Sequence, residues 1–144
     1  MQPEQLITKI RENLLEQRKR LQDYLEILES EKRDISKKDI NGLESHIVLE
    51  KRIIEELESF KKVLAPMELV YYNSPYKKDT LIKQLTESIN RLAGSVKEKS
   101  RLNTDELDTI LTKLKADINS KDRKRAAERT GYGLVEPVLV DISG

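Results

Sequence analysis

An apolar residue stands at every seventh position between residues 7 and 35. The members of this heptad are Ile7, Leu14, Leu21, Leu28 and Ile35. Such a repeat keeps one narrow apolar stripe on a helix, and the stripe has to be buried against another helix. A second set of apolar residues follows in two heptad phases, with Ile40, Ile47 and Ile54 in one and Leu43, Leu57 and Leu64 in the other. The two stripes predict a pair of long helices that pack on each other.

A short polar joint separates these two predicted helices. It spans residues 36–42 and contains Asp39. Asp39 is a good N-cap, because its carboxylate can accept hydrogen bonds from the free amides in the first turn of the next helix. A joint this short forces the two helices to run antiparallel.

Two prolines set the expected limits of the hairpin. Pro3 suits the first turn of a helix, because its fixed φ is already helical. Pro66 pushes the preceding residue away from helical geometry, so we expect the second helix to end near Ala65. The predicted hairpin therefore covers residues 3–65.

The segment that follows breaks the helical pattern. Residues 67–76 hold three of the five tyrosines of the chain. They are interpreted either as a connector that covers the end of the hairpin or as an amphipathic contact patch, since tyrosine combines a large apolar face with a polar tip. Ser74 and Pro75 are typical of a helix start. They predict a connector over residues 66–74 and a third helix over residues 75–120.

Spacings of three and four residues mark the stripe of this third helix. Its apolar residues are Ile82, Leu85, Ile89, Leu92, Val96, Leu107, Ile110, Leu111, Leu114 and Ile118. The stripe thins between residues 97 and 106, so one continuous helix and a separate helix capped by Asn103 are both open; we favour the first. The expected fold is all-α: an elongated antiparallel hairpin with a long third helix packed on it and a flexible C-terminal tail.

Composition narrows the class of protein further. Charged residues make up 37% of the chain and aromatic residues 4%, which is typical of long helices with thin seams. We expect one helical domain over residues 1–130. Because its core is thin, association of two copies into a homodimer is a further option. Because the chain has no Cys, no signal peptide and no apolar run of about 20 residues, we expect a cytoplasmic protein without membrane insertion.

The C-terminal part changes character twice. The basic run at residues 121–125 suits a helix C-terminus electrostatically, and a net charge of +1 gives no reason to expect nucleic acid as a partner. The tail at residues 131–144 combines glycines with apolar residues, among them Val138 and Val140. It is either a loose tail or a linear segment that binds another molecule.

Residues with catalytic potential are scarce. His46 is the only histidine, and no glycine-rich phosphate loop is present. Without cysteine or a second histidine, a transition-metal site is not expected. We therefore expect no enzymatic activity, no cofactor and no metal.

The order of motifs resembles the FlgN family of flagellar type III export chaperones. The family's hairpin has spaced leucines, an Asp that starts the second helix and a Glu-Lys pair; its third helix has an Asn followed by leucines, and a Tyr-Gly pair comes near the end. The matching positions here are Leu14, Leu15, Leu21, Leu25, Leu28, Glu31, Asp39, Leu43, Glu50, Lys51, Ile54, Leu57, Asn103, Leu107, Leu111, Leu114, Tyr132 and Gly133. The resemblance covers about residues 6 to 133, and it departs from the family where residues 134–137 replace a Pro-x-Gly continuation.

The resemblance implies a specific function. Chaperones of this family bind the C-terminal helical segments of the hook–filament junction proteins, prevent their premature assembly and dock on the cytoplasmic domain of the export gate. It points to Tyr132 and Gly133 as the gate-docking residues. The residues expected to bind the substrate protein are Leu85, Ile89, Leu92, Val96, Leu107, Ile110, Leu111 and Leu114.

The alternative function is that of a structural coiled-coil protein or scaffold without a role in export. It explains the heptads equally well. It leaves Tyr132, Gly133 and the apolar tail without a purpose.

Overall fold

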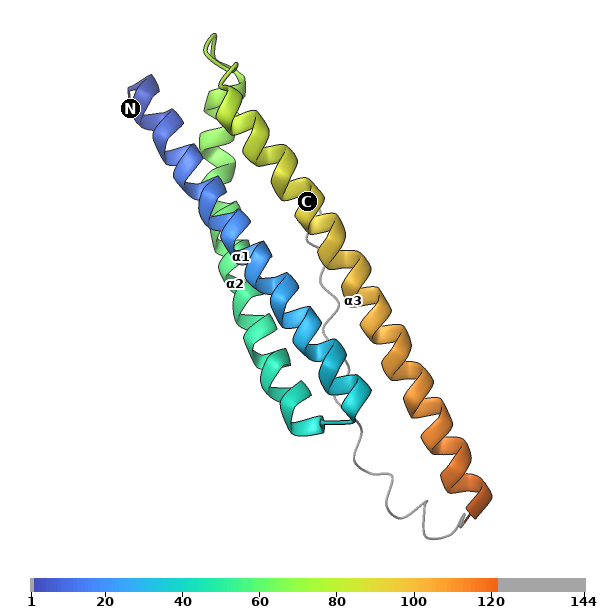
Figure 1. The fold of residues 1–144 in the computed structure, drawn as a ribbon. Coiled ribbons are helices and arrows are strands. Elements are labelled where there is room, and N and C mark those ends of the chain that lie inside the picture. The colour runs from blue at the N-terminus through green and yellow to red at the C-terminus, as the bar shows by residue number, and fades with distance from the viewer. Residues whose placement is uncertain (1, 122–144) are drawn as a thin grey trace.

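The computed structural model describes residues 2–121 as three long helices (Figure 1). These are α1 (Pro3–Lys37), α2 (Ile40–Tyr72) and α3 (Thr80–Lys121). α1 and α2 form an antiparallel hairpin, and α3 runs back along α1 and extends beyond the tip of the hairpin (Figure 1). The predicted all-α fold is confirmed. The predicted tail, residues 131–144, lies outside the described residues.

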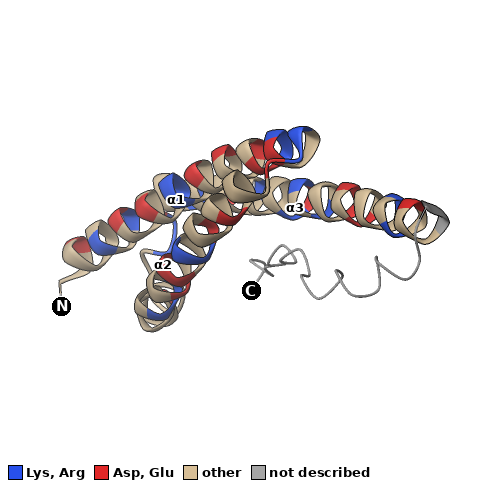
Figure 2. Ribbon diagram, turned by 90° about the horizontal axis from the view of Figure 1, so that it is seen from below, with Lys and Arg blue, Asp and Glu red and all other residues tan. Residues whose placement is uncertain are grey.

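α1 is the central helix of the fold. Both α2 and α3 pack along it, whereas no Cα atom of α2 lies within 8 Å of a Cα atom of α3 in these two described helices. The cross-section is therefore open, and Figure 2 shows α2 and α3 diverging from α1 in different directions. This arrangement leaves a space between α2 and α3.

The core follows α1 in three successive clusters of apolar side chains. The cluster at the N-terminal end of α1 contains Leu6, Ile10, Leu14, Leu64, Tyr71, Ile82 and Leu85. The middle cluster contains Leu21, Tyr24, Leu28, Ile53, Leu57, Ala93 and Val96. The cluster at the hairpin tip contains Ile35, Leu43, Ile47 and Leu107. The heptad of α1 thus contributes residues to all three clusters, as the sequence predicts.

The hairpin joint is tighter than its polar sequence suggests. Lys38 adopts the left-handed conformation with φ 55° and ψ 35°, which ends α1. Asp39 caps α2 as predicted, and its Oδ1 accepts a 3.0 Å hydrogen bond from the Gly42 amide. A Cβ at residue 42 would lie 2.5 Å from Asp39 Oδ2, so glycine leaves room for the capping carboxylate.

The predicted end of α2 near Ala65 is wrong, because the helix continues through Pro66 to Tyr72. Pro66 faces solvent, where its missing amide and its ring disturb packing least. One turn later the fully buried Tyr71 packs into the first core cluster. Burial of Tyr71 outweighs the local effect of the proline, and the predicted connector from residue 66 is replaced by a shorter loop over residues 73–79.

The start of α3 also differs from the prediction at Ser74 and Pro75. The helix begins at Thr80, and Asp79 is its cap: Asp79 Oδ1 accepts a 2.9 Å hydrogen bond from the Ile82 amide. Asp79 also forms an ion pair with Arg11 of α1. This ion pair fixes the loop to α1. Ser74 and Pro75 could not reveal it, because Arg11 and Asp79 are far apart in the sequence.

α3 is one continuous helix through residues 97–106. Asn103 is therefore not an N-cap. Its side chain is buried, and its Nδ2 donates a 3.0 Å hydrogen bond to the backbone carbonyl of Leu28 in α1. The thin part of the stripe is a polar contact between α3 and α1.

Candidate partner-binding clefts

Charges are mixed along all three helices. Blue and red segments alternate along the described parts of the three helices in Figure 2. Among residues 2–121, no group of three or more His, Cys, Asp or Glu side chains could hold a metal ion. The Nδ1 atom of His46 lies 2.5 Å from Asp34 Oδ2, which ties α2 to the end of α1. The remaining candidate sites are apolar clefts.

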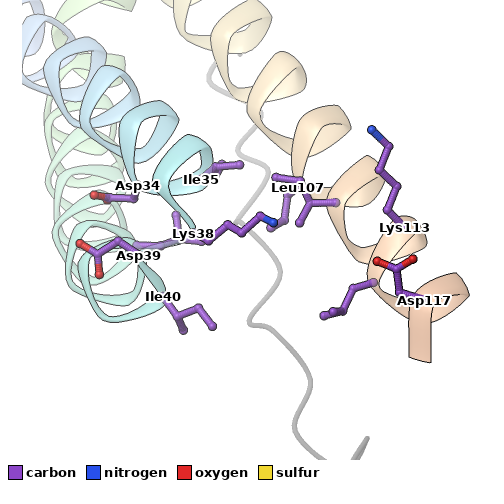
Figure 3. A pocket seen from close by; sticks show the side chains of 11 residues that line it. Asp34, Ile35, Lys38, Asp39, Ile40, Leu107, Lys113 and Asp117 are labelled. Atoms are coloured by element: carbon purple, nitrogen blue, oxygen red, sulfur yellow. The ribbon is translucent and has the colours of Figure 1, made fainter. Parts of the chain in front are cut away.

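The first is a cavity of about 380 Å³ at the hairpin tip, here called the tip cleft (Figure 3). Figure 3 shows Ile35 and Ile40 on the hairpin side and Leu107 on α3 around the space between them. The full lining is Asp34, Ile35, Lys38, Asp39, Ile40, Leu43, Leu107, Ile110, Lys113, Leu114 and Asp117. Its floor is apolar and its rim carries both signs of charge.

The tip cleft exists because the helices end at different levels. α1 ends at Lys37, whereas α3 continues to Lys121. Leu107 is buried against the hairpin, but Leu114, two turns further along α3, is 45% exposed. Ile40, across the cleft, is 49% exposed. The apolar stripe of α3 therefore extends beyond the end of the hairpin that covers it.

The second is a cavity of about 680 Å³ between α2 and α3, here called the α2–α3 groove. Leu14, Gln17 and Leu21 of α1 form its floor. Its walls carry Leu57, Lys61, Leu64 and Glu68 from α2, and Thr86, Ile89, Asn90, Ala93, Gly94 and Lys97 from α3. Nothing lies within 4 Å of a Cβ built on Gly94, so the α3 wall is open there.

The predicted substrate-binding residues are distributed over several environments. Leu85, Val96 and Leu107 are buried in the core, and Leu107 also lines the tip cleft. Leu92 and Leu111 are half-buried against the core. Ile89 lines the α2–α3 groove, whereas Ile110 and Leu114 line the tip cleft. The structure thus does not bring all eight to one surface. Tyr132 and Gly133 lie outside the described residues.

Residues that were not among the predicted substrate-binding residues complete both clefts. Ile40 supplies the hairpin side of the tip cleft, and Lys61, Glu68 and Lys97 charge the α2–α3 groove. The adjacent small residues Ala93 and Gly94 are the one local sign of the groove in the sequence. The charged residues give no such sign, since helix surfaces are generally charged.

A buried carboxyl pair lies between α1 and α2. Glu31 is 2% and Glu50 is 1% exposed. No donor among the other described residues reaches Glu31 Oε1 or Glu50 Oε2, whereas a protonated Glu31 can donate a hydrogen bond to Glu50. Burial, and then the neighbouring Glu50, raises the pKa of Glu31 to about 9. Burial also raises the pKa of Glu50. Both positions belong to the motif that resembles the FlgN family, and the fold brings them together.

No protein-family model, no curated protein and no solved structure matches this chain in the three comparisons. In the part of the chain that the structure describes, no helix has an apolar stretch long enough to cross a membrane.

Proposed function

We propose that the chain is a cytoplasmic flagellar export chaperone. It binds the C-terminal helical segments of hook–filament junction proteins, prevents their premature assembly and delivers them to the cytoplasmic domain of the type III export gate. The resemblance in motif order supports the identity of the partners. The tip cleft and the α2–α3 groove support the mode of binding, because an amphipathic helix binds by placing its apolar face in such a cleft.

The observation that carries the proposal is the uncovered end of the α3 stripe. Ile40 and Leu114 expose about half of their surface on opposite sides of the tip cleft. A helix placed between them would remove both side chains from water, and each buried apolar side chain stabilises a complex by roughly 1–2 kcal/mol. A partner that is disordered when free would fold on binding, and its ordering cost favours reversible release.

The test is the affinity of the full-length chain for the junction proteins of its source organism. Leu114→Asp should weaken binding at least roughly tenfold, because a carboxylate would be buried in the complex. Leu102→Asp is the matched control, since Leu102 is an exposed leucine of α3 that lines neither cleft. Circular dichroism should show that both variants keep the helical fold. Equal affinity of Leu114→Asp and the unsubstituted chain would reject the tip cleft as the binding site.

Docking on the export gate is proposed from the resemblance alone, through Tyr132 and Gly133. Tyr132→Ala should leave the affinity for the junction protein intact and reduce the affinity for the cytoplasmic domain of the gate. Unchanged affinity for the gate would count against this role.

A second candidate function, a self-associating structural protein, is favoured by a different surface. Val63, Leu69 and Val70 in the last turns of α2 are each more than half exposed. Large exposed apolar patches commonly mark interfaces between proteins. Light scattering across a concentration series decides between the two: a stable dimer that Val70→Lys dissociates, together with no affinity for junction proteins, would support the scaffold.

A further inference from the structure

The α2–α3 groove has the shape and lining of a binding site for one additional helix. Its floor and walls are apolar where Leu14, Leu21, Leu57, Leu64 and Ile89 meet. A helix that entered there would pack on α2 and α3 and complete a four-helix arrangement around one core. Gly94 leaves space on the α3 wall, so the incoming backbone could approach closely there.

Glu68 gives this apolar groove a specific charge requirement. Its side chain is half-buried, and none of the ion pairs between described residues includes it. Burial raises its pKa, which shows that the surroundings disfavour the carboxylate in the free protein. A cation supplied by a bound partner would relieve this penalty.

Two lysines give the other part of the groove the opposite sign. Lys61 on α2 and Lys97 on α3 contribute to its two walls. Lys61 precedes Glu68 by seven residues, which is two helical turns or about 10 Å along α2. Both lysines have interactions of their own, so Glu68 is the charge of the groove that an incoming helix would have to balance.

We propose that the α2–α3 groove selects a partner helix by the charge of Glu68. The helix has an apolar stripe and a Lys or Arg that meets Glu68. This inference rests on the proposed function and adds a specificity rule to it: among amphipathic helices of equal hydrophobicity, the groove prefers those with a cation at this position. A partner that places a carboxylate against Glu68 is disfavoured, because bringing like charges together across an interface is costly.

The experiment measures the affinity of the full-length chain for a junction protein of the source organism. Glu68→Lys should weaken binding roughly tenfold or more. Glu55→Lys makes the same charge reversal on an exposed position of α2 outside both clefts, and its affinity should stay within about twofold. Glu68→Gln should leave the thermal midpoint of the free protein equal or higher, because it removes a half-buried carboxylate. That result would show that Glu68 is not needed for folding.

Complementary reversal identifies the partner side chain. Single Lys→Glu or Arg→Glu changes in the bound segment are tested against the Glu68→Lys chain, and one of them should restore the lost affinity. If Glu68→Lys binds as tightly as the unsubstituted chain, or if no single reversal restores binding, the charge rule is rejected while the chaperone function stands. If the unsubstituted chain binds no junction protein at all, both the function and this rule are rejected.

Discussion

The hydroxyl of Tyr24 donates a 2.7 Å hydrogen bond to Oε1 of Glu50, and so joins α1 to α2 inside the core. Burial, and then Glu50, raise the pKa of Tyr24, and Glu31 adds to the shift. Two charges outside the pair also act on it: Asp34 raises the pKa of Glu31, and Lys51 lowers that of Glu50. Few opposite charges offset the burial of these two carboxyl groups. The pair therefore retains one proton, because ionising both groups at once would be costly.

The buried pair predicts that the protein becomes less stable as the pH rises from about 4.5 toward 9. The folded pKa of Glu31 is about 9 and its ordinary value is 4.5, so between these values the folded chain binds more protons than the unfolded chain. The contribution is complete below pH 4.5 and is lost as the pH rises toward 9. The free energy of unfolding should fall by up to about 1.4 kcal/mol per pH unit in this window. Urea titrations at several pH values measure it.

Glu31→Gln should flatten this pH dependence, since the amide is neutral at every pH and can donate a hydrogen bond to Glu50. Glu26→Gln, at an exposed position of α1, is the matched control and should keep the slope of the unsubstituted protein. A slope that survives in Glu31→Gln would mean that another group takes up the proton.

Asp79 predicts a second effect, at the opposite end of the bundle. The ion pair with Arg11, and then the Ile82 amide, hold the pKa of Asp79 below its ordinary value. Its stabilising contribution is therefore present above about pH 4 and is lost on further acidification. Asp79→Ala should lower the free energy of unfolding by at least about 1 kcal/mol through loss of the cap.

Asp79→Asn separates the two roles of this residue. Asparagine is a good cap but cannot pair with Arg11, so this variant should lie between the parent chain and Asp79→Ala. Thermal melts near neutral pH rank the three proteins. Equal melting of all three would show that the cap of α3 does not limit stability.

The sequence predicted the helices well wherever the apolar period was long. The heptad of α1 and the stripe of α3 extend over many turns, and period alone identifies such elements. It failed where a distant contact outweighs a local signal. Pro66 and Ser74 are local boundary signals, whereas the buried Tyr71 and the Arg11–Asp79 pair that overrule them join residues far apart in the chain.

The binding surface could be predicted only in part, for a related reason. Leu85 and Leu114 belong to the same apolar stripe, yet one is in the core and the other is exposed. The difference is set by where the hairpin ends, which no property of α3 encodes. Glu31 and Glu50 likewise lie on different helices, so their pairing emerges only from the packing of α1 on α2.

The hairpin joint predicts that glycine at residue 38 stabilises the protein. Lys38 is the one described non-glycine residue with positive φ, a conformation that costs a residue with a side chain roughly 1 kcal/mol. Lys38→Gly should therefore raise the free energy of unfolding by about 0.5–1 kcal/mol. Lys37→Gly, one residue earlier in helical conformation, should lower it. If both variants destabilise, the joint does not limit stability.

The continuity of α2 through Pro66 predicts a gain from removing the proline. A proline inside a helix is about 3 kcal/mol less favourable than alanine. Pro66→Ala also makes the unfolded chain more flexible, which offsets up to about 1 kcal/mol of that gain. The net expectation is a rise of about 2 kcal/mol in the free energy of unfolding, measured by urea titration. Ser59→Ala, at an exposed position two turns earlier in α2, controls for helix propensity and should change it by less than about 1 kcal/mol. If α2 instead ended near Ala65, residue 66 would lie outside the helix, and Pro66→Ala would leave stability unchanged or slightly reduced.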